Sequence, residues 1–264
     1  MGISVRDHCL IVGTVAEALL RRIRALVAHG VATLAGMHDV GKISPGFEAQ
    51  HEPWTYLYPD LGPFIGCETD HAKISQWVVQ QLLQDKKLFR WGVPVGGHHG
   101  KIKGAHVTEF ILNGLIGDGP WNNYRLELAR ELIARFGPLP TQPPTPTGAE
   151  LWWLAGLITV SDWIGSDKTF FQQDRTSTHE DREARAEAAL DTLHWGKAAV
   201  KSNLSFRKLF SRRARKLQQT AFDQITWPGL YIIEALMGDG KTEPALAGAY
   251  TLISKGLASH VSLK

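Results

Sequence analysis

The feature that most constrains this chain is a His-Asp pair at the end of an apolar segment, within Ala35-Gly36-Met37-His38-Asp39-Val40-Gly41-Lys42-Ile43. Neither His38 nor Asp39 is expected in a hydrophobic core without a partner, because burying an unpaired polar or charged group costs free energy. Both are good ligands for a divalent metal ion. On a helix of about 3.6 residues per turn they point in different directions, which favours flanking a metal pair with the carboxylate between two ions. Lys42, four residues after His38, would lie on nearly the same face and reach a phosphate held there.

A His-Asp pair alone is weak evidence, since a surface His beside an acid is common. Apolar periodicity predicts helices over residues 5–28 and 31–40 and a third that begins at His71, with Asp70 as its N-cap. His8 lies in the first turn of the first helix, and His71 opens the third. Each of these histidines taken alone is read more simply as an ordinary residue near a helix start.

The segment Gly96-Gly97-His98-His99-Gly100 is predicted to be part of a turn over residues 91–100. Paired histidines between glycines suit neither a core nor a helix, and glycine allows the backbone to approach a ligand closely. Residues 107–115 and 124–136 are predicted to be helical, and the Pro-rich residues 137–148 to be an excursion within one domain.

Residues 150–163 form a predicted helix that looks too hydrophobic for the surface, and it ends in Ser161-Asp162-Trp163-Ile164-Gly165-Ser166. A carboxylate buried at Asp162 needs a partner. A metal ion would be one, and an arginine or a helix cap would be another.

Composition sets limits on the partners and the compartment. The net charge of +3 and the pI near 8.8 permit a nucleic-acid partner without requiring one. Two cysteines, Cys9 and Cys67, suggest no disulfide framework and fit a reducing cytoplasm. The N-terminus lacks a signal-peptide pattern, and the longest apolar run, Leu151–Val160, is too short to span a bilayer.

The last third of the chain has a different character. Residues 177–193 are predicted to be a charged helix opened by a capping box. Residues 201–216 are basic with interleaved Phe206 and Phe210, which fits either a phosphate-contacting patch or a basic surface helix.

Residues 229–235 read as a buried strand that runs into Met237-Gly238-Asp239-Gly240-Lys241-Thr242 and then a helical pattern. Strand, glycine-rich turn, Lys-Thr and helix make up the context of a P-loop, in which Lys241 would bind phosphates and Thr242 would reach Mg²⁺. Only 22 residues follow Thr242, so we expect the opening of a second domain that has been cut off.

In order, these motifs resemble a known family. The series His8, His38-Asp39-x-Gly-Lys42, His71, His98-His99-Gly and Asp162-Trp resembles the HD-superfamily nuclease domain of the type I CRISPR-associated helicase-nuclease. Residues 233–243 resemble the first helicase motif of that protein. Arg215-Lys216-Leu217-Gln218 resembles the segment that carries its adenine-contacting glutamine.

The resemblance implies an all-α HD domain over residues 1–200, a basic linker or the start of the helicase region over 201–228, and a truncated P-loop segment, strand then turn then helix, over 229–264. It implies two divalent transition-metal ions (Fe, Mn, Co, Ni or Zn), with Asp39 bridging them and Lys42 neutralising the scissile phosphate. The implied metal ligands are His8, His38, Asp39, His71, His98, His99 and Asp162. The implied nucleotide-binding residues are Gln218, Gly238, Gly240, Lys241 and Thr242, with ATP and Mg²⁺ used only by the complete helicase.

The implied activity is cleavage of single-stranded DNA in the cytoplasm, in CRISPR antiviral interference, after an RNA-guided surveillance complex recruits the full-length protein. No membrane partner is expected. Two alternatives remain at this point. One is an HD phosphohydrolase that acts on a small or cyclic nucleotide, which would not explain the P-loop or the basic segment. The other is a non-catalytic nucleic-acid or protein-binding module that keeps a vestigial metal site.

Overall fold

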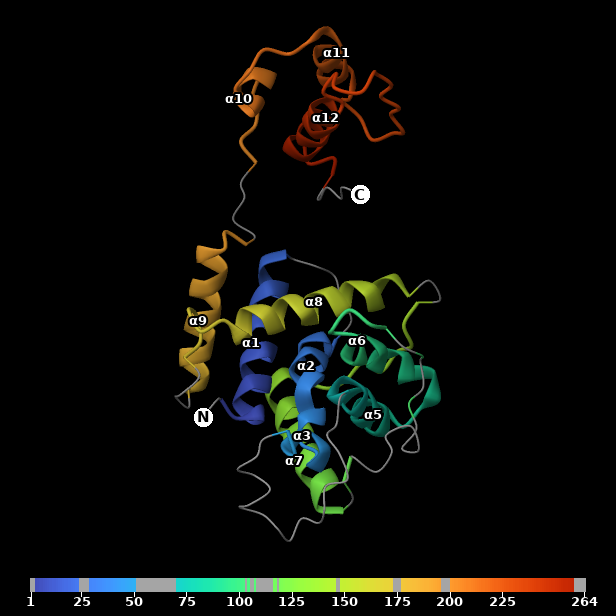
Figure 1. Ribbon diagram of the computed structural model, residues 1–264, viewed down its shortest axis with the longest axis vertical. Coiled ribbons are helices and arrows are strands. Elements are labelled where there is room, and N and C mark those ends of the chain that lie inside the picture. Colours follow the sequence, from blue (N-terminus) through green and yellow to red (C-terminus); the bar gives the residue numbers. More distant parts are fainter. Residues whose placement is uncertain are drawn as a thin grey trace. The chain divides into compact units, whose positions relative to one another are not determined.

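A computed structural model describes residues 3–23, 29–50, 70–102, 104, 107, 116–117, 119–145, 148–172, 177–195 and 200–258. The chain divides into two compact units, Met1–Lys197 and Ala198–Lys264. All described elements of both units are helices, and no strand occurs among the described residues (Figure 1). No helix in this part of the chain is both long and apolar enough to cross a membrane.

The first unit is built around α1 (Val5–Ile23), which packs against α2 (Val31–Gly36), α8 (Ala149–Ser166) and α9 (His179–Thr192). Almost every residue of α1 from Asp7 to Leu19 is buried, as expected of a helix with neighbours on several sides. Salt bridges join α9 to the far end of α1, where Arg22 contacts Glu187 and Asp191. His8 is therefore held at the opposite end of a firmly packed helix.

The remaining helices of this unit complete the surroundings of the His-Asp pair. The 3-10 helix η1 (Met37–Lys42) packs against α5 (His71–Leu83), and α5 packs against η3 (Lys86–Trp91) and α6 (Gly92–Gly96). The short α3 (Pro45–Glu48) follows η1, and α7 (Gly119–Phe136) contacts α2 and η1. Side chains of these helices form one hydrophobic core.

Several predicted helices are confirmed, including α5, where Asp70 Oδ1 accepts a hydrogen bond from the Lys73 amide as expected of an N-cap. The helix α9 also forms, but Thr178 Oγ1 caps it by accepting from the Asp181 amide, in place of the expected capping box. Residues 91–100 were predicted to be a turn, but α6 covers Gly92–Gly96, and only the residues after it form the turn. Residues 24–28, and all of 107–115 except Val107, lie outside the described residues.

The prediction that His38 and Asp39 end an ordinary α-helix was wrong in detail. The α-helix stops at Gly36, and Met37–Lys42 continue as a 3-10 helix. Residues three apart eclipse one another in a 3-10 helix, so Lys42 lies over Asp39 rather than over His38. Its Nζ is 2.6 Å from Asp39 Oδ2.

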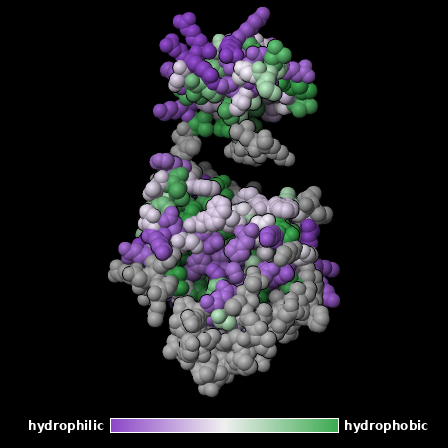
Figure 2. All heavy atoms as spheres, viewed as in Figure 1, coloured by the Kyte–Doolittle hydropathy of each residue, from purple (hydrophilic) through white to green (hydrophobic). Residues whose placement is uncertain are grey.

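The second unit contains α10 (Phe206–Phe210), α11 (Lys216–Gln224) and α12 (Thr242–Ser254), of which α11 and α12 pack together. The expected strand over residues 229–235 is not formed. A strand needs a neighbour to satisfy its backbone groups, and none is present among the described residues. Leu230, Ile232, Leu236 and Met237 are between 77% and 99% exposed, and Figure 2 shows hydrophobic side chains on the surface of this unit.

Candidate metal centre

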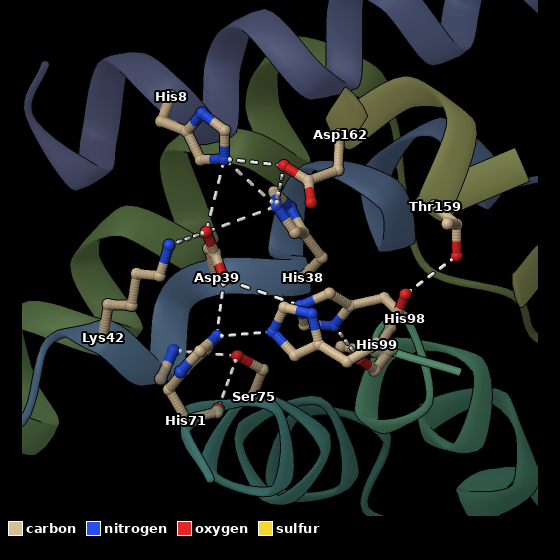
Figure 3. Close-up of polar contacts among 12 residues, drawn as sticks. His8, His38, Asp39, Lys42, His71, Ser75, His98, His99, Thr159 and Asp162 are labelled. Atoms are coloured by element: carbon tan, nitrogen blue, oxygen red, sulfur yellow. Dashed lines mark hydrogen bonds and ion pairs between the residues drawn. The ribbon is translucent and has the colours of Figure 1, made fainter. Parts of the chain in front are cut away.

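All the predicted metal ligands of the first unit converge on one centre (Figure 3). His8 comes from the first turn of α1, His38 and Asp39 from η1, and His71 from the first turn of α5. His98 and His99 follow α6, and Asp162 comes from α8. The site is thus assembled from helix ends and one short 3-10 turn, with apolar helices behind it.

The ligand atoms fall into two groups that share Asp39. The His8 cluster consists of His8, His38, Asp162 and Asp39 Oδ2. Within it, His8 Nε2 lies 3.2 Å from His38 Nε2, from Asp39 Oδ2 and from Asp162 Oδ1. Asp162 was predicted to be buried, and its side chain is 19% exposed.

The His71 cluster consists of His71, His98, His99 and Asp39 Oδ1. His71 Nε2 is 3.0 Å from His99 Nε2 and 3.3 Å from Asp39 Oδ1, and His98 Nε2 is 3.7 Å from the same oxygen. The two oxygens of Asp39 therefore face different clusters, and this carboxylate stands between them.

Two atoms of the site show that its residues fit a metal ion. Asp39 Oδ1 and His98 Nε2 are buried, yet neither has a hydrogen-bond partner among the described residues. A buried polar atom without a partner is costly, which indicates that something else satisfies it. Three ligand atoms in each cluster, from His8, His38 and Asp39 and from His71, His98 and His99, also lie within 4.8 Å of one another.

The backbone orients two of these imidazoles. His38 Nδ1 is 2.9 Å from the Ala35 carbonyl oxygen, and His98 Nδ1 is 2.7 Å from that of Val95. A metal-binding histidine usually donates its other ring N–H to such an acceptor, which fixes the ring and leaves the second nitrogen for the ion. Here that second nitrogen is Nε2, which faces the cluster in both residues.

The electrostatics of the two clusters differ. Burial would lower the pKa of His38, but the Asp39 and Asp162 carboxylates outweigh it and raise the pKa to about 9. Burial likewise opposes ionisation of Asp39 and Asp162, yet the neighbouring histidines hold the pKa of both carboxyls below the ordinary range. In the His71 cluster, burial and then the charge on His38 lower the pKa of His98 to about 4. The two carboxylates of the His8 cluster therefore favour a positive charge there, either a proton on His38 or a metal ion, whereas the His71 cluster disfavours protonation of His98.

Sequence reasoning missed the side chains that hold the site together. Ser75 Oγ on α5 accepts a hydrogen bond from the Gly41 amide at 2.9 Å and lies 3.1 Å from the His71 carbonyl oxygen, so it joins η1 to α5. Thr159 Oγ1 on α8 is 2.9 Å from the His98 carbonyl oxygen. Neither residue stands out in the sequence. Thr159 precedes Asp162 by three residues, which is the only signal that it faces the same way.

Arg125 was also missed. Its side chain on α7 is fully buried, and its Nη1 donates to the Ile43 and Ile116 carbonyl oxygens at 2.7 and 2.6 Å. It fixes the backbone that follows Lys42. A buried arginine has no sequence signature, because the same residue in an amphipathic pattern usually faces solvent.

The five predicted nucleotide-binding residues lie in the second unit. Gln218 Nε2 donates to the Gly240 carbonyl oxygen at 3.2 Å, and Lys241 Nζ donates to those of Ala235 and Leu236 at 2.8 and 3.1 Å. Gly238 and Gly240 have φ of 91° and 72°, a region that glycine adopts readily. Thr242 is the first residue of α12. A glycine-rich turn thus leads into a helix here, but without the strand expected before it.

An all-helical unit with a His-Asp motif, further histidines and an aspartate converging on one centre defines an HD-type domain. Residues 3–171 match the model of the family described as Cas3, HD domain, and the chain belongs to this family.

Relatives of known name agree with this assignment. The chain is 30% identical to the CRISPR-associated endonuclease/helicase Cas3 of Thermus thermophilus over 95% of its own length and 31% of that protein. It is 24% identical to the protein of the same name from Escherichia coli, over 91% of this chain and 32% of that one. The chain therefore spans about a third of the length of these curated relatives.

Among solved structures, the T. thermophilus Cas3 HD domain in the presence of Ni²⁺ is 26% identical, with a TM-score of 0.55, and the match covers 73% of this chain and 86% of that one. A structure described as a CRISPR-associated protein is 25% identical, with a TM-score of 0.70, over 96% of this chain and 32% of that one.

Proposed function

We propose that the first unit is a metal-dependent nuclease that hydrolyses phosphodiester bonds of single-stranded DNA at a two-metal centre, in type I CRISPR interference. The single observation that carries this is the position of Asp39, whose two oxygens face the two ligand clusters. The names of the relatives, which are endonuclease/helicases, support the reaction class. We propose residues 1–200 as the nuclease domain, 201–228 as a basic linker or the start of the helicase region, and 229–264 as a truncated P-loop segment of a helicase domain.

The chain's own residues divide the work. His8, His38, Asp162 and Asp39 Oδ2 would hold one ion, and His71, His98, His99 and Asp39 Oδ1 the other. N and O donors without a thiolate suit Mn, Fe, Co, Ni or Zn. Such a pair supplies a hydroxide nucleophile and charge stabilisation for both oxygens of the displacement. Buried carbonyl contacts at His38 and His98 keep their Nε2 atoms aimed inward.

The proposed reaction needs only the first unit. Every proposed ligand lies within it, so cleavage should not require ATP. The glycine-rich turn that leads into α12 supports a role of the second unit in nucleotide binding, in a longer protein whose partners include the RNA-guided surveillance complex. That assembly would act in the cytoplasm.

The function is tested by incubating the chain with Mn²⁺ or Ni²⁺ and, separately, circular single-stranded DNA, circular duplex DNA and cyclic dinucleotides, without ATP. Cleavage of the single-stranded circle that stops when a chelator is added is the expected result. A duplex is stiff over about 150 base pairs, so a recessed centre should cut it far less. Hydrolysis of the cyclic dinucleotides with intact DNA would instead support a small-nucleotide phosphohydrolase.

Replacing Lys42 by Met should slow cleavage about 100-fold while the metal content stays the same. An ammonium cannot ligate a cation, but at 27% exposure it can neutralise a phosphate beside Asp39. Loss of one such charge-stabilising group typically costs about 10²–10³ in rate. Lys73→Met is the matched control, because Lys73 pairs with Asp70 and contacts neither cluster. If Lys42→Met lost its metal and its thermal stability together, Lys42 would be structural.

A further inference from the structure

Helix α8 turns its aliphatic side chains inward and its tryptophans outward. Leu154 and Ile158 are fully buried, whereas Trp152 and Trp163 are 67% and 69% exposed. The sequence alone predicted that this whole run would be too hydrophobic for the surface. The structure instead separates two kinds of apolar residue, and the larger aromatic ones are left in solvent.

The two exposed rings lie on one side of the helix. Eleven residues separate Trp152 from Trp163, which is about three turns and roughly 16 Å along the axis. Between them on the same side is Gly156, which is exposed and has no atom within 4 Å of the position that a Cβ would take. We call Trp152, Gly156 and Trp163 the indole face. At Gly156 this surface has no side chain, and an indole ring lies near each end of it.

One end of the indole face follows a residue of the candidate metal centre directly in the chain. Asp162, which lies 3.2 Å from His8 Nε2, immediately precedes Trp163 in the helix. Thr159, three residues earlier, contacts the carbonyl oxygen of His98 (Figure 3). The helix that supplies a proposed ligand therefore also presents an aromatic ring one residue further on.

We infer that the indole face binds the bases of a single-stranded nucleic acid whose backbone enters the metal centre, an inference that rests on the proposed function. A base that stacks on an aromatic side chain gains affinity, and stacking tolerates any sequence because every base has a π-face. The phosphates would meet positive charge at Lys42, which is 27% exposed, and at Lys101, which is exposed and follows the His98-His99 turn. Bases and backbone thus have separate, chemically matched surfaces.

The composition of the face favours this occupant over a protein. A helix that docks in a protein groove presents apolar anchors at i, i+3, i+4 and i+7 on its outer side, whereas Trp152 and Trp163 are eleven residues apart with Gly156 between them. On α8 the aliphatic residues Leu151, Leu154, Leu157 and Ile158 are all buried in this unit. What remains outside near the centre is indole and glycine. Bases in a duplex are already stacked on one another, so free rings select single strands.

The test measures oligonucleotide binding separately from the chemistry. We would prepare Trp163→Ala, Trp152→Ala, Trp163→Tyr and Trp163→Leu in the full chain. Binding of a fluorescent oligo-deoxythymidine is followed by anisotropy in the presence of a chelator. Hydrolysis of bis(p-nitrophenyl) phosphate with Mn²⁺ reports on the metal centre without using a base.

Trp195→Ala is the matched control. Trp195 is 37% exposed, and its carbonyl oxygen accepts from Arg22, which lies roughly 21 Å along α1 from His8. We expect each alanine variant on the indole face to weaken oligonucleotide binding about tenfold to a hundredfold, with hydrolysis of the small phosphodiester unchanged. Trp163→Tyr should retain most of the affinity and Trp163→Leu should lose it, because leucine is apolar but cannot stack.

Unchanged affinity in both alanine variants, or full affinity in Trp163→Leu, would overturn the inference and assign the face to a protein contact. The experiment distinguishes failure of this inference from failure of the proposed function. If the unmodified chain cleaved neither DNA nor bis(p-nitrophenyl) phosphate with any metal, the proposed nuclease would be refuted, while the binding comparison would still decide the role of the face.

Discussion

Replacing Asp39 by Asn should abolish cleavage of single-stranded DNA and remove metal from the chain. Asp39 is 2% exposed, and its two oxygens serve both clusters, so the change weakens both at once. Losing only an outer partner of a metal ligand costs about 10- to 100-fold in affinity or activity. Loss of the shared ligand should cost at least about 100-fold. Cleavage rates and elemental analysis of protein purified without chelator would measure both effects.

The matched control for this change is Asp191→Asn. Asp191 pairs with Arg22 at the end of α1 away from His8, so the same chemical change there should leave metal content and cleavage intact. Asparagine has nearly the same shape as aspartate, so the variant should still fold. Thermal unfolding in the presence of a chelator would show whether the Asp39→Asn protein is folded. DNA cleavage that persists in a folded Asp39→Asn protein would mean that the active site lies elsewhere.

The residues that the sequence singled out as metal ligands lie together in the structure, and most of them are polar residues at the end of an apolar helix. His38-Asp39 and Asp162 stand out for that reason and His98-His99 for the glycines around them, whereas His8 and His71 stand out only when the whole series of motifs is considered. Helix ends converge easily, so their grouping followed from the pattern. The sequence pattern does not predict which ligand atoms, such as the two oxygens of Asp39, face which cluster. That depends on the 3-10 geometry of η1, which places Lys42 beside Asp39.

The wrong predictions share one cause, which is that they depend on contacts between segments far apart in the sequence. Residues 229–235 have strand character, but a strand forms only with a partner, and hydrogen-bonding neighbours do not appear in a local pattern. The tryptophans of α8 raised its apparent hydrophobicity, yet a helix with neighbours on one side buries only that side. Ser75, Thr159 and Arg125 act on backbone groups of distant segments, and such contacts leave no mark in the sequence around them.

Replacing Gly41 by Ala should destabilise the first unit and separate the two elements that carry Asp39 and His71. A Cβ at Gly41 would lie 2.0 Å from the His71 carbonyl oxygen and 2.7 Å from the Ser75 amide nitrogen. Both are backbone atoms of α5, so the contact is relieved only if η1 moves away from α5. We expect a loss of about 3 kcal/mol in the free energy of unfolding, or roughly 6–12 °C in Tm, which circular dichroism would measure.

Gly156→Ala is the matched control. It adds the same methyl group in the same unit, but it should raise the free energy of unfolding instead of lowering it. Gly156 lies exposed within α8 with open space around it, so alanine there should stabilise the helix by about 0.5–1 kcal/mol. The two variants also differ at the metal centre. In Gly41→Ala, Asp39 Oδ1 moves away from the His71 cluster, and titration with Ni²⁺ should show weaker binding of one ion than in Gly156→Ala. Equal melting temperatures and equal Ni²⁺ binding in the two variants would show that η1 and α5 are not in the close contact on which the shared Asp39 depends.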